Sequence, residues 1–324
     1  MRVFGRLSQE QIVFGLAVLL CLGFALALPG FLTAQNILNL VRSVSILGIL
    51  GVAMGLVVIG RGIDLSLVAL MAISVAWTLQ LATNGMPMGL ALALGLAFCL
   101  AVGLLNGFMV AYVEIPAIFA TLAMGIAVYG FGRYVMFSLD VVYLPQDAEA
   151  FRWLGQGRLL GVPTPICMFA LVSFLAFLFL RYTHQGRYLR TVGDNLAAAR
   201  ISGVPARPVI LMQYMIAATI GFVGGCVTAA SVASMNTRVA NSTMIYDVIL
   251  VVVLGGIGLS GGKGGIRNVI VGTLLIGVLL NGMTIMDIQY TVQNVIKGVI
   301  LLTAIVIDTM LNPRDEQTAQ QGDI

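Results

Sequence analysis

Residues 88–110 read MGLALALGLAFCLAVGLLNGFMV, an apolar run without a single charged side chain. A helix needs roughly 20 consecutive apolar residues to cross a bilayer core about 30 Å thick. Similar runs recur along the whole chain, in which 60% of the 324 residues are hydrophobic and only 9% are charged. A soluble domain carries about 25% charged residues. The sequence therefore predicts an all-α integral membrane protein that crosses the bilayer many times.

The hydropathy pattern divides the chain into about ten transmembrane segments. Their expected bounds are 11–28, 44–59, 65–82, 88–110, 115–136, 164–181, 208–234, 246–259, 268–286 and 289–308. The eighth is short and ends in glycines, so it is either continuous or broken and partly re-entrant. We expect residues 1–308 to form a single transmembrane domain. Residues 309–324 are expected to be a disordered cytoplasmic tail because they contain too few apolar side chains to pack.

The positions of the cations predict the orientation, since cytoplasmic loops carry an excess of Lys and Arg. With the N-terminus inside, 11 of the 17 cations fall on the cytoplasmic side. These are Arg2, Arg6, Arg61, Arg181, Arg187, Arg190, Arg200, Arg207, Lys263, Arg267 and Arg314. The outer side has Arg42, Arg152, Arg158 and Arg238, whereas Arg133 and Lys297 lie within segments. Both termini are therefore expected in the cytoplasm, and the net charge of +4 indicates membrane topology rather than a nucleic-acid partner.

Three segments are too polar to span the bilayer: 29–43 and 138–163 on the outer side, and 182–207 on the inner side. In the first, four apolar residues predict a stripe lying in the membrane interface: Phe31, Ile37, Leu38 and Val41. In the third, AAAR is typical of a short exposed helix. Asp194 and Asn195 are its candidate caps, and Gly203 ahead of Pro205 is its expected end.

Residues 254–265, LGGIGLSGGKGG, have the glycine density of a nucleotide-binding loop. A phosphate loop needs glycine six positions before its lysine and a hydroxyl residue after it. Ile257 and Gly264 occupy those positions around Lys263, so the pattern fails. A dinucleotide site also fails, because no βαβ unit surrounds these glycines. We interpret the stretch as a tight cytoplasmic turn between the eighth and ninth segments, with no nucleotide and no other cofactor.

Catalytic and metal chemistry have no support in the residue pattern. Cys21, Cys99, Cys167 and Cys226 lie in or beside apolar segments without paired spacing, so they are expected to be small hydrophobic side chains. The single histidine, His184, stands in the basic inner loop with no nucleophile and acid around it. The chain is therefore expected to be neither an enzyme nor a metalloprotein.

Three motifs together resemble one family: VVIGRGIDLS at 57–66, VGDNLAAARISGV at 192–204 and VVLGGIGLSGGKG at 252–264. The resemblance is to the permease subunit of bacterial carbohydrate ABC importers of the ribose, xylose, arabinose and galactofuranose type, and it covers residues 44–308. The residues that match the family turns are Gly62, Asp64, Ser66, Gly256, Gly261 and Gly262. The chain departs from the family pattern at Leu67 and Val68, where Val-Gly is usual, and at Leu196, where an acidic residue is frequent.

The resemblance implies a transport subunit of the bacterial inner membrane whose ATP hydrolysis takes place in a separate cytoplasmic ATPase subunit. It also implies a periplasmic sugar-binding protein and a second permease subunit, identical or different, as partners. The segment that would dock in a groove of the ATPase comprises Asn195, Ala197, Ala198, Ala199 and Gly203.

Several polar side chains lie at membrane depth, where they are costly and usually face the protein interior or water. Asp247 and Lys297 both lie toward the outer side, so we expect them to pair, with Lys297 reaching outward to the interface. Asn106, Gln213 and Asn281 either line a sugar pathway or form hydrogen bonds between helices.

The sequence thus predicts an ATP-driven sugar importer permease for a pentose or hexose. A secondary transporter of a small polar solute, driven by an ion gradient, remains the alternative; it predicts carboxylates at the centre of segments. The transported sugar and the choice between a homodimer and a heterodimer stay open.

Overall fold

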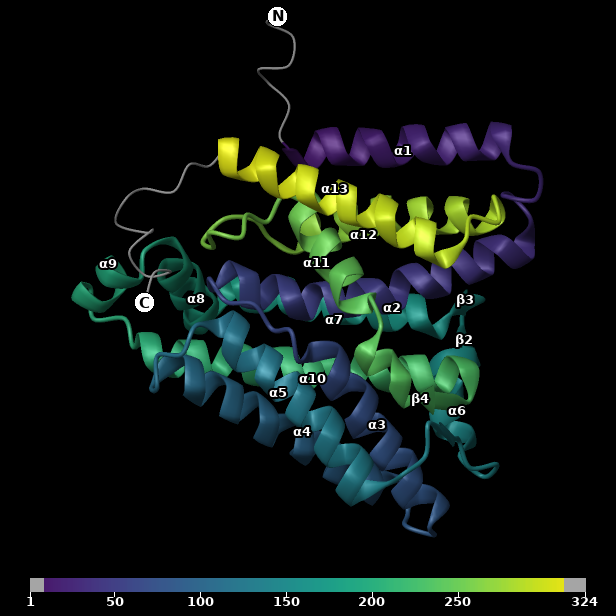
Figure 1. The fold of residues 1–324 in the computed structure, drawn as a ribbon, viewed down its shortest axis with the longest axis horizontal. Coiled ribbons are helices and arrows are strands. Elements are labelled where there is room, and N and C mark those ends of the chain that lie inside the picture. The colour runs from purple at the N-terminus through teal and green to yellow at the C-terminus, as the bar shows by residue number, and fades with distance from the viewer. Residues whose placement is uncertain (1–8, 312–324) are drawn as a thin grey trace, which may run out of the picture.

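Apolar helices make up most of the described chain, residues 9–311 of a computed structural model (Figure 1). The long helices are α1 (Gln9–Ala27), α2 (Ala34–Ile59), α3 (Leu67–Thr83), α4 (Met88–Ala111), α5 (Ala117–Phe131), α7 (Thr164–Tyr182), α10 (Ala206–Val232), α11 (Met244–Leu254), α12 (Ile266–Ile285) and α13 (Tyr290–Leu311). A π-helical turn, η2 (Gly132–Met136), extends α5. The predicted all-α membrane fold is confirmed. The cations at positions 2, 6 and 314 and tail residues 312–324 lie outside the described residues.

Seven helices of the described part are long and apolar enough to cross a membrane, if α5 is counted together with η2. The helix α3 is shorter, and α11 has only 11 residues. At 1.5 Å per residue α11 is about 16 Å long, roughly half of a bilayer core. The predicted segment 246–259 is therefore not one continuous helix, because its last five residues belong to the glycine turn that follows Leu254.

The second helix begins ten residues earlier than its predicted segment. Thr33 caps α2, its side chain accepting a hydrogen bond from the backbone of Asn36, so residues 34–43 are the first turns of a long helix. The predicted interfacial stripe is thus wrong for Phe31, which is buried beside Phe24 with 5.9 Å between ring centroids. The hydropathy pattern misses this start because residues 34–43 include several polar amide side chains, although their backbone is helical. At the other end, α13 continues to Leu311, past the predicted boundary at 308.

Helix α2 lies in the middle of the bundle, with α1, α12 and α13 on one side and α3, α4, α5 and α10 on the other (Figure 1). Its last 16 residues are buried apart from Ile46, which is half-buried. Close packing depends on glycine, as the small-xxx-small spacing predicts. A Cβ atom at Gly107 of α4 would lie 2.7 Å from the Cα of Leu211 in α10, and one at Gly103 would lie 2.9 Å from the carbonyl oxygen of Tyr214.

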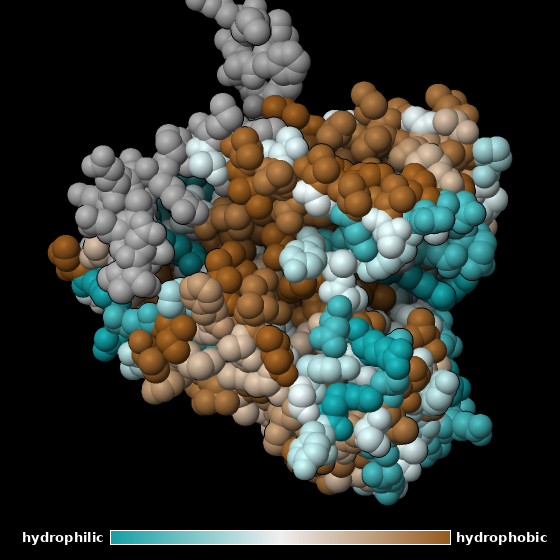
Figure 2. All heavy atoms as spheres, in the orientation of Figure 1, coloured by the Kyte–Doolittle hydropathy of each residue, from teal (hydrophilic) through white to brown (hydrophobic). Residues whose placement is uncertain are grey.

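The short elements gather at the two ends of the bundle (Figure 1). One end carries α6 (Glu149–Gln156), two small antiparallel pairs and the 3₁₀ turn η3 (Thr237–Asn241). The pairs are β1 (Val141–Tyr143) with β4 (Ser234–Asn236), and β2 (Arg158–Leu159) with β3 (Val162–Pro163). The other end carries α8 (His184–Asp194) and α9 (Leu196–Ile201). Hydrophilic side chains collect toward these ends, while hydrophobic ones cover the helices between them (Figure 2).

Candidate functional site

The predicted coupling segment folds as the short helix α9. Asn195 ends α8 and caps α9, because its side-chain oxygen accepts a hydrogen bond from the backbone of Ala198 at 2.9 Å. Gly203 follows with φ +78°, which terminates the helix. Ala197 and Ala198 are exposed, whereas Ala199 is fully buried in the core. The helix therefore exposes small side chains on one face and packs against the core through Ala199 on the other.

Glu114 links α9 to the turn between α4 and α5. Its carboxylate lies 3.3 Å from the guanidinium of Arg207 and 3.7 Å from that of Arg200. All three side chains are about half exposed, so each pair contributes little to stability. The buried Ala199 is therefore the stronger attachment of α9 to the membrane-spanning bundle.

The glycine turn after α11 packs closely against the backbone of other segments. The amide of Gly262 donates a hydrogen bond to the carbonyl oxygen of Ile59, at the end of α2, over 2.8 Å. A Cβ atom at Gly262 would lie 2.7 Å from the Cα of Asp194, and one at Gly261 would lie 2.9 Å from the carbonyl oxygen of Gly193. A Cβ atom at Gly193 would overlap the carbonyl oxygen of Ile59. We name these five residues the glycine junction.

The glycine junction joins three segments that are far apart in the sequence: the end of α2, the end of α8 next to α9, and the turn between α11 and α12. Gly256, Gly261 and Gly262 all have positive φ, at +92°, +83° and +73°, a region that other residues rarely adopt. Backbone approach and left-handed conformation therefore explain why glycine is required here.

The GIDLS motif forms a buried polar cluster between α2 and α3. Asp64 accepts hydrogen bonds from the backbone amide of Ser66 at 3.0 Å and from its hydroxyl at 2.6 Å. Asn106 of α4 donates to the same hydroxyl at 2.8 Å. All three side chains are fully buried. Gly62 lies beside them, where a Cβ atom would come within 2.7 Å of the Tyr214 hydroxyl. The motif holds the start of α3 inside the bundle, with Asn106 as its link to α4.

The predicted pair of Asp247 and Lys297 is confirmed. The Lys297 ammonium lies 2.7 Å from the Asp247 carboxylate, and the side chains are only 6% and 14% exposed. The same ammonium donates to the Thr243 hydroxyl at 3.4 Å. Lys297 thus stays buried instead of reaching the interface, because its counter-ion on α11 is close enough to neutralise it.

Asn281 lies apart from Asn106 and makes a reciprocal amide pair with Asn36. Asn36 donates to the Asn281 carbonyl oxygen at 3.0 Å, and Asn281 donates back at 2.8 Å. Asn36 also donates to the backbone oxygen of Phe31 at 2.7 Å. Sequence reasoning missed Asn36 because it assigned residues 29–43 to an interfacial segment.

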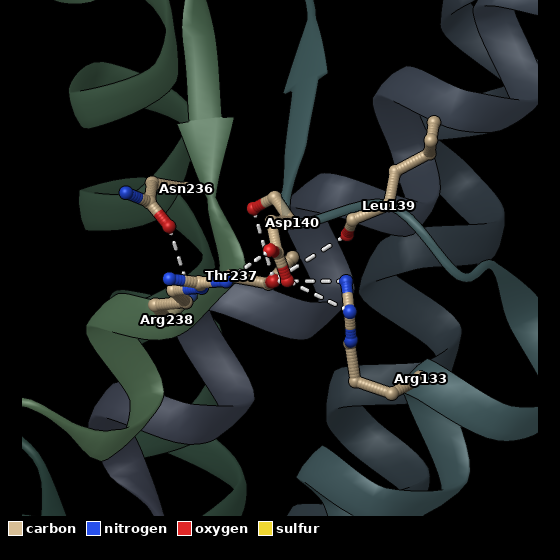
Figure 3. Close-up of polar contacts among 6 residues, drawn as sticks. All are labelled: Arg133, Leu139, Asp140, Asn236, Thr237 and Arg238. Carbon is tan, nitrogen blue, oxygen red and sulfur yellow. Dashed lines mark hydrogen bonds and ion pairs between the residues drawn. The ribbon is translucent and has the colours of Figure 1, made fainter.

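A second feature that the sequence did not reveal is a charged clamp at the end that carries the β-strands (Figure 3). The Asp140 carboxylate binds Arg133 at 2.7 Å and Arg238 through its other oxygen. Thr237 donates its backbone amide and its hydroxyl to the Asp140 carbonyl oxygen, at 2.8 and 3.0 Å. The hydrogen bond from Arg238, with the nearby charges of Arg238 and Arg133, lowers the pKa of Asp140 from its usual 3.8. The clamp and the β1–β4 pairing tie the two loops together.

Comparison with known proteins adds independent information. A family model described as branched-chain amino acid transport system / permease component matches residues 36–305. The ribose import permease protein RbsC of Escherichia coli K12 is 32% identical over 303 residues, 93% of this chain and 94% of that protein. The L-arabinose ABC transporter permease protein AraH of Azospirillum brasilense is 35% identical, covering 88% and 83% of the two chains.

The galactofuranose transporter permease protein YtfT of Escherichia coli K12 is 30% identical and covers 85% of this chain and 79% of its own. No solved structure matches the chain.

Proposed function

The chain belongs to the family of branched-chain amino acid transport system permease components, and on this premise we propose that it is the membrane-spanning subunit of an ATP-driven sugar importer. The resemblance carried by the three sequence motifs is confirmed by the ribose, arabinose and galactofuranose permeases among its relatives. The chain is a multi-pass transmembrane permease for sugar transport in the bacterial inner membrane. Pentoses and hexoses are the proposed substrate class.

Energy is proposed to come from a separate ATPase subunit that docks on α9. The observation that carries this proposal is that α9 follows directly in the chain from two residues of the glycine junction, Gly193 and Asp194. Gly193 and Asp194, directly before the capping residue Asn195, touch both the end of α2 and the turn between α11 and α12. A displacement of α9 is therefore transmitted through backbone contacts to two interrupted helical regions of the bundle. A gradient-driven transporter would need no such docking helix.

The opposite end is the proposed docking surface for a periplasmic sugar-binding protein. The two loops that would meet it, residues 138–163 and 236–243, are joined by the β1–β4 pairing and by the Asp140 clamp. A joined surface presents its contacts together, which reduces the ordering cost of binding.

Ten membrane-embedded segments with both termini in the cytoplasm are the proposed topology. The excess of cations at the α8–α9 end supports this orientation. In this arrangement α11 covers about half of the bilayer depth, and its end lies level with the first turn of α12, where the Asn268 side chain donates to the Gly255 carbonyl oxygen at 2.8 Å. Residues 1–308 are proposed to act as one domain, paired with a second permease subunit. The exposed apolar side chains of α5, among them Phe119 and Ile126, face either that subunit or lipid.

An Ala198→Glu substitution tests the proposed docking helix. Placing a charged side chain on the exposed small-residue surface should prevent the cognate ATPase from co-purifying and abolish ATP-dependent uptake, while the permease still folds. Ala150→Glu, at an exposed alanine of α6 on the other end, is the matched control and should still co-purify with the ATPase. Full ATPase binding and uptake in the Ala198→Glu protein would contradict the proposal. Uptake that survives vanadate but collapses with a protonophore would favour the ion-driven alternative.

A further inference from the structure

A cavity of about 450 Å³ with both polar and apolar lining residues lies between α2, α10, α11 and α12. It is at the end of the bundle that carries the β-strands, since its lining includes the beginnings of α2 and α11 and the end of α12 (Figure 1). Its volume is within the range of small-molecule sites, about 300–1,000 Å³. Its polar lining includes Asn36, Asn39, Thr228, Asp247, Asn281 and Thr284.

The amides of the cavity retain free hydrogen-bonding capacity. An asparagine side chain offers two donors and two acceptor positions. Asn281 uses one of each in its pair with Asn36, so half of its capacity is available to a ligand. The pair also fixes the orientation of the Asn281 amide without help from a ligand.

The two threonines are arranged as acceptors. The hydroxyl of Thr228 donates to the backbone oxygen of Gly224 and that of Thr284 to the backbone oxygen of Leu280, each at 2.8 Å. A hydroxyl that donates within its own helix keeps its lone pairs for an incoming donor. The cavity therefore combines amide donors with hydroxyl and amide acceptors, the set that a polyhydroxylated ligand requires.

The charge of the cavity distinguishes between classes of solute. Among its lining residues Asp247 alone is ionisable, and Lys297 neutralises it at 2.7 Å. A zwitterionic amino acid would bury a carboxylate and an ammonium group without dedicated counter-ions, which is costly. A neutral sugar has no such penalty, and the apolar side chains of Leu40, Leu47 and Leu280 can contact its C–H surface.

We propose that this cavity is a monosaccharide-binding subsite on the outer part of the import pathway, in which the Asn36–Asn281 pair orients the binding amides. The inference rests on the proposed function and deepens it by naming where the sugar binds. Neutral monosaccharides occupy the cavity, and amino acids of similar size do not.

Protection from thiol labelling tests occupancy directly. In a variant whose four native cysteines are replaced, Thr284→Cys places one thiol in the cavity, and Ala150→Cys on α6 is the control. Both are labelled with a membrane-impermeant maleimide in membranes that contain the assembled transporter. D-ribose or L-arabinose at millimolar concentration should slow labelling of Thr284→Cys at least fivefold. Neither sugar should affect Ala150→Cys, and L-leucine should affect neither thiol.

Measuring sugar uptake in a double variant tests the proposed subsite separately from the proposed importer function. Asn36→Leu with Asn281→Leu replaces both members of the pair, so neither side-chain amide is left without its partner, although the hydrogen bond from Asn36 to the Phe31 carbonyl oxygen is also lost. We expect normal ATPase binding and at least a tenfold loss of sugar uptake. Unprotected labelling together with normal uptake would overturn the subsite and leave the importer function standing. Protection by leucine and not by sugars would overturn both.

Discussion

Replacing Gly262 by alanine should damage the protein more than replacing Gly203, although both glycines have a left-handed backbone. Their φ angles are +73° and +78°. A Cβ atom at Gly262 would lie 2.7 Å from the Cα and 2.8 Å from the amide nitrogen of Asp194, whereas nothing lies within 4 Å of one at Gly203. The comparison therefore isolates the contact at the glycine junction from the conformational cost.

The expected magnitudes follow from these two terms. A left-handed backbone costs an L-residue about 1–2 kcal/mol, and this cost applies at both positions. Overpacking against atoms that cannot move aside costs roughly 1–3 kcal/mol more, and it applies only at Gly262. Gly203→Ala should therefore lower the free energy of unfolding by about 1–2 kcal/mol, and Gly262→Ala by about 2–5 kcal/mol.

Unfolding by SDS in mixed micelles measures the difference, with tryptophan fluorescence as the signal. The two tryptophans, Trp77 and Trp153, belong to α3 and α6 and lie outside both changed segments. ATP-dependent uptake should be lost in Gly262→Ala beyond the level that its remaining folded fraction explains, because we propose that the junction also transmits movement from α9. Equal destabilisation of the two variants, or normal uptake per folded Gly262→Ala molecule, would refute the role of backbone contact.

Three further changes have defined outcomes. Lys297→Met leaves the Asp247 carboxylate buried without its partner and should lower the free energy of unfolding by about 3–5 kcal/mol in the same SDS titration. The double variant Lys297→Met with Asp247→Asn should regain most of this stability. A double variant as unstable as Lys297→Met alone would contradict the pairing. Asn195→Ala removes the cap of α9 and should cost about 1 kcal/mol of local stability, seen as faster hydrogen exchange at 196–201, and Asn195→Asp should preserve protection. Because the pKa of Asp140 is lowered from 3.8, the ionised clamp stabilises the fold above that value and the contribution is lost as pH falls through the lowered pKa. The melting temperature of the wild type should thus decline below about pH 4, and that of Asp140→Asn should depend less on pH in this range. If Asp140→Asn shows the same acid dependence as the wild type, the clamp is not the source of that dependence.

Hydropathy predicted the helices because most residues of a segment that lies in lipid are apolar. It failed where polar residues belong to a helix for another reason. Gln35, Asn36 and Asn39 lower the average at the start of α2, yet Asn36 is placed there by its partner Asn281, 245 positions away. A hydropathy average over neighbouring residues contains no information about a partner so distant in the sequence.

Those features of the candidate site that depend on residues close together in the sequence could be predicted. The cap of α9 by Asn195 and the turn at Gly203 follow from neighbouring residues, and both were predicted. The pairing of Asp247 with Lys297 was predictable because few charges lie at membrane depth, so each had few possible partners. Asp140 was not, since the outer loops contain several charged residues and only the β1–β4 register brings Arg238 to it.

The glycine junction has a consequence for divergence, because its contacts are made by amide nitrogens, carbonyl oxygens and Cα atoms that every residue type possesses. Asp194, whose side chain is exposed, can be exchanged for other amino acids over evolutionary time and still present the same atoms to the turn, whereas the fully buried side chain of Ile59 is constrained by the core. Gly261 and Gly262 have no such freedom. A deep mutational scan should therefore show one permissive position, Asp194, directly touching one that accepts no replacement, Gly262.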